Sequence, residues 1–481
     1  MLCLIMQLAR RIVFLGLLIT YLIGCPLAVL YVLGYVIVPG TEHGVVKTGL
    51  ISLATVPSDA SIYLEGRRYT KTTPTVLERL YPGTYHVKVA LKHYRPWTQT
   101  VRVDAGQAAV FEKILLLPDQ PAIKVLLPVP LEEMTPLPET RFVILSMGRA
   151  IDDLLVYDRD ASASWPLLPD PGPWHDSRVL SLLAVKGSPW LLLRVKSQDG
   201  EHYLGAALKT GHARVTDLTK LFSVRPQEVI WSASWPHQLF SMQGGSVNHL
   251  DLEAAAIYPR VIDRIRGIGV HEQTLYALTE DFALYRVDRE GKRLELLFED
   301  PSMAEALSGV SGMFHVTVLS RDLVVLMGAR GELWVSRFPA RLVGEGMRGF
   351  AFDSKRERLL IWDNDRLGLL DCAVGRRQDA AADDAPVLRW IWTEGKDLRQ
   401  AFWAHDASHI VFQDGETVGL LPLESAGVSA PIPLLRVRAG SAVSYEDDAG
   451  GVYYLDRATG ALSFLSVVPR TGFQRLLHEP E

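Results

Sequence analysis

Two short polar clusters are the first places where this sequence could bind a ligand or carry out chemistry. Asp363-Asn364-Asp365, followed by Gly368, has the acidic spacing that begins a calcium-binding loop. However, Leu367 takes the fifth position, and no glutamate stands at the twelfth. His405 and His409 have the i, i+4 spacing that would bring two imidazoles onto one metal ion in a helix. The residues between these histidines read as a turn joining two apolar strands, so the imidazoles need not meet. We therefore expect polar turns at both clusters.

The remaining motifs also favour turns. Gly244-Gly245-Ser246 is typical of a tight turn, and Asp447-Asp448 before Gly450-Gly451 predicts a solvated hairpin turn. The sequence has no Gly-x-Ser-x-Gly elbow, no His-Glu-x-x-His, no phosphate-binding loop and no Cys-x-x-Cys pair. We assign no catalytic, cofactor-binding or metal-ligating residue, and we expect a protein that is not an enzyme.

Composition gives no sign of nucleic-acid binding, of a disulfide framework or of a zinc site. The 481 residues carry a formal net charge of -5, so there is no basic footprint for nucleic acid. Cys3, Cys25 and Cys372 are too few and too scattered for a disulfide framework or a zinc site.

A repeated strand pattern predicts the type of domain in which these turns lie. Apolar strand ends followed by Asp recur at Tyr157-Asp158, Leu250-Asp251, Val287-Asp288, Leu370-Asp371 and Leu455-Asp456. Weaker equivalents lie at Ala207-Leu208, Ser336-Arg337 and Leu421-Pro422. The mean period of about 43 residues is that of propeller blades. We expect residues 141–470 to form a β-propeller of seven or eight blades, with seven if the first and last marks share one blade.

Residues 48–118 alternate apolar and polar side chains between turn signals, which predicts a small antiparallel β-sandwich. Their motifs resemble the PEGA domain of bacterial surface proteins. The resemblance rests on Pro57-Ser58-Asp59-Ala60, Ile62 to Gly66, Thr73-Pro74 and Leu80 to Tyr85. Lys92-His93-Tyr94 departs from the family's usual Lys-x-Gly-Tyr spacing. The resemblance implies a surface spacer or binding module without catalytic residues, and Gly66 and Gly83 are expected to supply turns.

The chain also resembles a subgroup in which one membrane helix leads into the PEGA domain and a propeller-like region follows. Residues 12–38 carry no charge and are preceded by Arg10-Arg11, which predicts a transmembrane signal anchor. The two arginines outweigh Lys47, so residues 1–11 are expected in the cytoplasm and the rest outside it. One alternative stays open, because Leu22-Ile23-Gly24-Cys25 resembles a lipobox that would place lipid on Cys25.

Two segments complete the expected organisation. Residues 119–140 are proline-rich and predict a semi-rigid linker, with room for one short strand, and residues 471–481 predict a C-terminal tail. The whole indicates a non-enzymatic binding or scaffolding protein of the cell envelope, whose partner is an envelope protein or a cell-wall glycan. An envelope enzyme acting on glycan or peptide through the propeller mouth, and a purely structural surface protein, are the alternatives.

Overall fold

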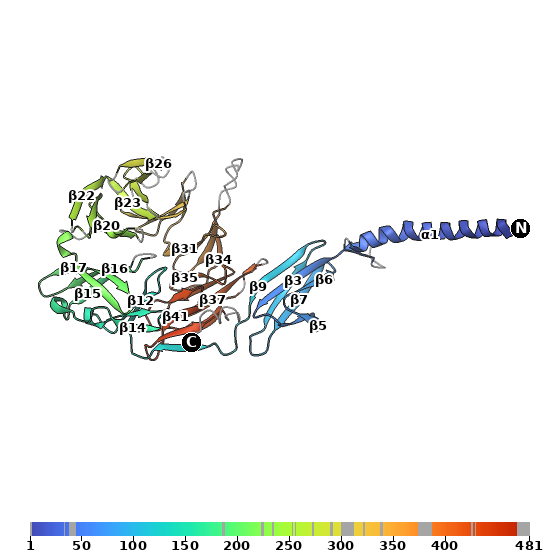
Figure 1. The fold of residues 1–481 in the computed structure, drawn as a ribbon, viewed down its shortest axis with the longest axis horizontal. Coiled ribbons are helices and arrows are strands. Elements are labelled where there is room, and N and C mark those ends of the chain that lie inside the picture. The colour runs from blue at the N-terminus through green and yellow to red at the C-terminus, as the bar shows by residue number, and fades with distance from the viewer. Residues whose placement is uncertain are drawn as a thin grey trace. The chain divides into compact units, whose positions relative to one another are not determined.

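The computed structural model describes residues 2–468, and its chain divides into two compact units. The first consists of Met1–Ala122 with Leu423–Gly427 and Ser466–Glu481, and the second of Ile123–Pro422 with Val428–Leu465. The description omits residues 33, 38–44, 185–187, 223–225, 233–234, 253, 255, 272–273, 289–291, 300–311, 321–322, 337–339, 374–386, 425–426 and 429. The expected tail at 471–481 therefore lies outside the described residues. Figure 1 shows the helix and the sheets of both units.

The first element is a long apolar helix, α1 (Leu2–Val32). Its segment Phe14–Val32 has a mean hydropathy of 2.2, and its 19 residues reach about 29 Å, close to the thickness of a bilayer core. The helix does not continue to residue 38 as expected. Gly34 has φ +82°, a conformation that commonly ends helices, and β1 (Tyr35–Ile37) then pairs with β2 (Val45–Lys47).

Residues 49–115 form a β-sandwich of seven strands. One sheet has the order β6-β3-β9 and the other β5-β4-β7-β8. The strands are β3 (Gly49–Val56), β4 (Ser61–Leu64), β5 (Arg67–Thr72), β6 (Thr75–Leu80), β7 (Gly83–Ala90), β8 (Trp97–Val103) and β9 (Ala108–Leu115). Ile51, Leu53, Ile62, Val87 and Val101 fill the core between the sheets.

Two details of this sandwich differ from expectation. The β3–β9 pair is parallel, so the sandwich is not purely antiparallel. Gly66 occupies its turn with φ +75°, but Gly83 begins β7 without a positive φ, and Arg79, at the register shift inside β6, instead has φ +59°. A glycine in a sequence marks a permissive position, and the neighbouring pairing decides whether that freedom is used.

The second unit is a β-propeller of eight sheets, which the described residues define. In seven of these sheets, all the strands are consecutive in the sequence, and the sheets follow one another in chain order. The first four are β11 (Glu133–Pro136), β12 (Phe142–Ser146), β13 (Leu154–Asp158), β14 (Ala163–Pro166); β15 (Arg178–Ala184), β16 (Trp190–Lys196), β17 (Glu201–Lys209), β18 (His212–Asp217); β19 (Glu228–Ser232), β20 (Trp235–Gln243), β21 (Ser246–Asp251), β22 (Ala256–Asp263); and β23 (Ile265–His271), β24 (Thr274–Thr279), β25 (Ala283–Val287), β26 (Arg293–Glu299).

The next three blades follow the same plan. They are β27 (Phe314–Ser320), β28 (Leu323–Gly328), β29 (Leu333–Ser336), β30 (Ala340–Gly344); β31 (Gly349–Asp353), β32 (Arg358–Trp362), β33 (Leu367–Asp371), β34 (Arg389–Trp392); and β35 (Leu398–Ala404), β36 (His409–Asp414), β37 (Thr417–Glu424), β38 (Gly427–Val428), β39 (Ile432–Arg436). Short 3₁₀ turns lie at Ile151–Asp153, Gly172–Trp174 and Thr219–Leu221.

The eighth blade joins the two ends of the propeller sequence. Its strands β40 (Ser444–Glu446), β41 (Gly451–Leu455) and β42 (Leu462–Ser466) are completed by β10 (Ile123–Leu127), which pairs antiparallel with β42. β10 and β11 both lie within residues 119–140, so this stretch is part of the propeller and not only the expected linker. The prolines of this stretch are compatible with β10 and β11 because both are end strands of their sheets, which pair on one side only.

The eight repeat marks correspond to eight separate blades. Seven of them fall at or near the ends of third strands, as Tyr157-Asp158 does in β13. The last mark, Leu455-Asp456, ends the second strand of its blade, which still leaves β42 to follow. The first and last marks therefore do not share a blade.

Apolar clusters between neighbouring blades close the ring. The first and eighth blades pack through Leu131, Met134 and Leu145 against Tyr453 and Leu455, and comparable clusters link each blade from the first to the sixth. Polar contacts join the later blades. Arg348 Nη1 lies 2.7 Å from Asp397 Oδ1, and Gln413 Nε2 donates to Ser441 O at 2.9 Å. A blade exposes an apolar face alone, so closing the ring buries every such face.

Candidate functional site

The acidic loop at Asp363 is closed by an arginine of the same loop. Asp363 Oδ1 accepts the N–H groups of Asp365 and Arg366, and Oδ2 lies 2.6 Å from Arg366 Nη2. Burial raises the pKa of Asp363, but the hydrogen bonds and charge of Arg366 outweigh it and hold the pKa below its ordinary value. The guanidinium takes the side of the carboxylate that a cation would use, and the loop is a polar turn.

The two histidines approach one another more closely than the turn between them suggested. The rings of His405 and His409 have centroids 5.6 Å apart, and Ser408 Oγ lies 2.8 Å from His409 Nδ1. Burial, followed by the charge of His405, lowers the pKa of His409 to about 3, so this ring is neutral near pH 7. Among the described residues, no third His, Cys, Asp or Glu completes a metal-ligand set with this pair.

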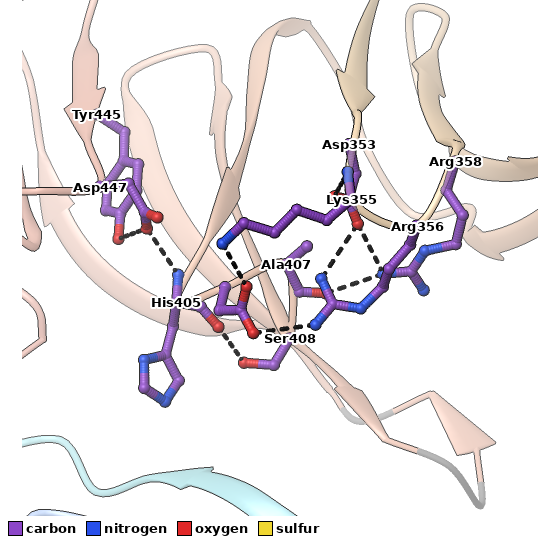
Figure 2. A network of polar contacts seen from close by, with 10 residues as sticks. Asp353, Lys355, Arg356, Arg358, His405, Ala407, Ser408, Tyr445 and Asp447 are labelled. Carbon is purple, nitrogen blue, oxygen red and sulfur yellow. Dashed lines mark hydrogen bonds and ion pairs between the residues drawn. The ribbon is translucent and has the colours of Figure 1, made fainter.

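The turn that carries His405 holds three successive residues in the left-handed conformation. His405, Asp406 and Ala407 have φ of 51°, 51° and 53°, which costs each residue about 1 kcal/mol. Contacts from the sixth blade hold this turn (Figure 2). Lys355 Nζ and Arg356 Nη2 lie 3.2 and 3.0 Å from the Asp406 carboxylate oxygens. The strain is therefore offset by ion pairs that cross between blades.

Two more carboxylates extend the contacts in Figure 2. The buried side chain of Asp353 lies 3.2 Å from Arg356 Nη1 and 3.3 Å from Arg358 Nη2. In the eighth blade, Asp447 Oδ1 accepts the His405 N–H at 3.1 Å. Ion pairs thus tie the first turn of the sixth blade to that of the seventh, and a backbone N–H to carboxylate hydrogen bond ties the seventh to the eighth. We interpret this network as an inter-blade clamp, because its acidic and basic groups already satisfy one another.

Two other polar clusters lie in the first and second blades. Asp152, His175 and Asp176 bring their ligand atoms within 4.8 Å of one another, but His175 Nδ1 already contacts Asp152 at 3.0 Å and both partners of Asp152 are exposed. Ser197 Oγ lies 2.9 Å from His202 Nε2, as a nucleophile and its base would. Ser197 Oγ also accepts the Asp199 N–H, which fixes the serine in the β16–β17 turn. Neither cluster was singled out from the sequence.

A cavity of about 540 Å³ opens between the inner strands of the second and third blades. Leu183 of β15, Leu192 of β16 and Trp231 of β19 supply apolar walls, and Ser181 and Gln227 add polar groups. The Trp231 ring packs against Trp190 with centroids 5.0 Å apart. The cavity volume is within the range of about 300–1,000 Å³ that small-ligand sites occupy.

Arg194 places a guanidinium on the wall of this cavity. It is paired in register with Ser181 on β15 and Tyr203 on β17, so the three side chains share one face of the second blade. The Arg194 side chain is 15% exposed, and its nearest carboxylate oxygen, on Glu201, is 3.9 Å from Nε. The Nε–H is buried and has no hydrogen-bond acceptor among the described residues.

A second charged pair crosses the cavity rim. His315 Nδ1 of the fifth blade lies 2.9 Å from Glu228 Oε1 of the third blade, and this hydrogen bond raises the pKa of His315 despite partial burial. His315 of the fifth blade can contact Glu228 of the third because the inner strands β23 and β27 of the fourth and fifth blades pack closely. A Cβ on Gly269 of β23 would lie only 2.5 Å from Val316 O of β27, so glycine allows the two inner strands to approach backbone to backbone.

Sequence reasoning did not identify Arg194, Glu228 or His315. The last two are 87 residues apart and belong to no motif, so only the ring brings them together. Arg194 did carry a signal, because it places a charge inside the apolar strand Trp190–Lys196. A charge in a strand whose neighbours are buried indicates either an ion pair or a polar site.

Comparison with known families identifies the first folded unit. The PEGA domain family matches residues 48–115, which are the strands β3 to β9 of the sandwich. Residues 48–115 are a PEGA domain. The PEGA motifs lie where the sequence placed them, with Ile62 of the β4 motif in the core and Gly66 in the following turn. Among curated protein sequences, none matches the chain.

Solved structures with some similarity to the chain include a designed protein and a β-propeller domain, each at low identity. The computationally designed Ika8 protein is 11% identical, with a TM-score of 0.42, and the match covers 71% of this chain and 97% of that one. BamB from Moraxella catarrhalis is 10% identical, with a TM-score of 0.41 and coverage of 72% and 99%. The Cps50 (Swd1) β-propeller domain of Myceliophteria thermophila is 11% identical, with a TM-score of 0.37 and coverage of 72% and 100%. From its helix α1, the family match of residues 48–115 and the order of its eight four- or five-stranded sheets, the chain combines an apolar N-terminal helix, a PEGA domain and a β-propeller.

Proposed function

We propose that this protein is a non-enzymatic docking protein of the cell envelope. The helix α1 anchors it in the cytoplasmic membrane, the PEGA domain is a spacer, and the propeller binds a segment of an envelope protein outside the cytoplasm. The arginines at 10 and 11 support this orientation, because positive charges are retained on the cytoplasmic side. The type of domain supports it as well, since the PEGA family belongs to bacterial surface proteins.

The cavity between the second and third blades carries the proposal. It combines apolar walls with polar groups from separate strands, which is the composition of a site that recognises a ligand. Leu183 is 38% exposed there, so an apolar side chain of the wall is accessible to a ligand. Binding fits better than catalysis, because His315 at the rim is engaged by Glu228. No hydroxyl or thiol of the described residues is hydrogen-bonded to its ring.

Site-specific photocrosslinking in intact cells tests the proposal. We would place p-benzoylphenylalanine at Leu183, in the cavity, and at Leu296, on the outer strand β26, as the control. The two side chains are comparably exposed, at 38% and 46%. We expect light to produce one dominant protein adduct from position 183 and none from position 296.

Other outcomes would favour the alternatives. Equal adducts from both positions, or none from either, would contradict docking in the cavity and support a purely structural surface protein. An adduct that glycan hydrolases shift, but proteases do not, would identify a cell-wall glycan as the partner and contradict a protein segment.

A further inference from the structure

We propose that the cavity recognises the free carboxyl terminus of an apolar peptide, with Arg194 as the carboxylate-binding residue. This inference rests on the proposed docking function and names the chemical group that is bound. The inference begins from the burial and the incomplete hydrogen bonding of the Arg194 guanidinium. The side chain is 85% buried, it lines the cavity, and its Nε–H has no acceptor within the described part of the chain.

The carboxylates near the cavity do not fully satisfy the Arg194 guanidinium, so it is the group in the wall that would bind an anion. Glu228, the acidic residue on the wall, is hydrogen-bonded to His315 at 2.9 Å. Glu201 is 3.9 Å from Arg194 Nε, which is beyond hydrogen-bond distance, and its side chain is 47% exposed. A carboxylate entering the cavity would therefore meet a guanidinium whose ion pair with Glu201 is long and whose Nε–H has no acceptor among the described residues. A guanidinium also matches the planar geometry of a carboxylate.

The rest of the wall indicates what carries the carboxylate. Leu183, Leu192 and Trp231 offer apolar contacts next to Arg194, so the group that follows the carboxylate should be apolar. The wall also presents the Ser181 hydroxyl and the Gln227 side-chain NH2, which could bond to a peptide backbone, while Gln227 Oε1 already accepts the Gly244 N–H at 2.9 Å. An unbranched hydrocarbon chain would leave these groups without partners once water is displaced. We therefore infer a peptide terminus and not a fatty acid.

The test uses the full chain in lipid nanodiscs, so that no detergent competes for the apolar walls. Isothermal titration calorimetry would compare N-acetylated tripeptides ending in Leu, Phe or Ala as free acids with the same peptides as carboxamides. We expect at least one acid to bind ten-fold or more tightly than its amide. We expect this preference to weaken as salt is raised, because an ion pair contributes to it.

Two substitutions and one control assign the preference to a residue. Arg194→Met should lower the affinity for the acid to that of the amide, without changing the affinity for the amide. Arg194→Lys should retain part of the preference, since the charge remains. Arg286→Met is the matched control, because Arg286 also lies on a blade strand but pairs with Glu295 at 3.1 Å outside the cavity. Thermal melts would establish that each variant is folded.

Three results would overturn the inference. They are equal affinities for acid and amide in the unmodified protein, no binding of any acid at millimolar concentration, and tighter Arg194-dependent binding of laurate than of the peptides. The first comparison needs no variant, so it decides the question even if Arg194→Met fails to fold. A position-183 adduct in cells together with any of these results would leave the docking function standing and reject only its carboxyl-terminal ligand.

Discussion

Closure of the propeller through residues 119–140 can be tested with one buried leucine. Leu131 lies between β10 and β11 and is fully buried where the first blade meets Tyr453, Leu455 and Leu462 of the eighth. Its N–H also donates to Gly460 O at 3.1 Å. Leu131→Ala keeps that backbone bond but leaves a cavity between the terminal blades. Such a change in a core costs about 3 kcal/mol.

The expected shift in melting temperature follows from the size of the unit. The propeller spans about 340 residues, for which the entropy of unfolding is about 0.7 kcal/mol/K. A loss of about 3 kcal/mol should therefore lower the Tm of the propeller transition by about 4 °C. Differential scanning calorimetry of the full chain would measure it, and guanidinium unfolding would give the free energy independently.

Val125→Ala is the matched control for this prediction. Val125 belongs to β10, in the same sequence stretch, but its side chain is 55% exposed, so the change should cost less than about 0.5 kcal/mol. If Leu131→Ala melts within 1 °C of Val125→Ala, the first and last blades do not depend on this contact. The stretch would then be a linker, as the sequence alone indicated, and the closed ring would be wrong.

Three further predictions follow from the clamp, the buried histidine and the anchor. Asp353→Asn should destabilise the propeller by about 2 kcal/mol, because it leaves Arg356 and Arg358, which are only partly exposed, without their shared carboxylate; calorimetry would measure this. The pKa of His409 is lowered to about 3 in the folded state, against 6.5 unfolded, so its contribution to stability is complete above pH 6.5 and is lost as the pH falls toward 3. Chemical unfolding of wild type and His409→Gln across this range should show a shallower fall for the variant, by up to about 1.4 kcal/mol per pH unit. Protease added to intact cells, or to spheroplasts where an outer membrane is present, should digest the propeller.

Each of these predictions has a contradicting outcome, and the His409 prediction also has a control. An unchanged Tm for Asp353→Asn would show that the charges of the clamp contribute nothing to stability. Exposed His212→Gln should leave the pH profile of unfolding unaltered, and identical profiles for wild type and His409→Gln would mean that the buried ring is not kept neutral. Complete protection of the propeller from external protease would place it in the cytoplasm.

Much of the architecture could be predicted because it depends on local patterns. Alternating side chains and turn residues mark strands wherever a sheet has one buried face, so β4 and β7 lie at the motifs of residues 62–66 and 80–85. The repeat marks predicted a propeller because each blade buries its third strand in the same way. The uncharged N-terminal run indicated a long apolar helix, although Gly34 ends it earlier than expected.

The turn conformations were only partly visible in the sequence. Asp363 was expected in a polar turn, and its loop is one, but the role of Arg366 in closing it depends on rotamers and local geometry. The turn between His405 and His409 implied only that the two imidazoles need not meet, and in the structure, where three successive residues are left-handed, the ring centroids are 5.6 Å apart. That conformation is unfavourable by itself and is held by side chains from the neighbouring blades.

What the sequence by itself determined was the set of elements, because side-chain alternation, turn residues and hydropathy act over a few neighbouring positions. Only the tertiary structure decided that the proline-rich stretch completes the last blade and that the ring has eight blades, because strand pairing joins residues more than 300 positions apart, as Ile123 and Leu465 show. The cavity has the same origin. Arg194 and Trp231 lie on separate blades, and their common wall exists because the second and third blades pack against each other through a shared apolar cluster.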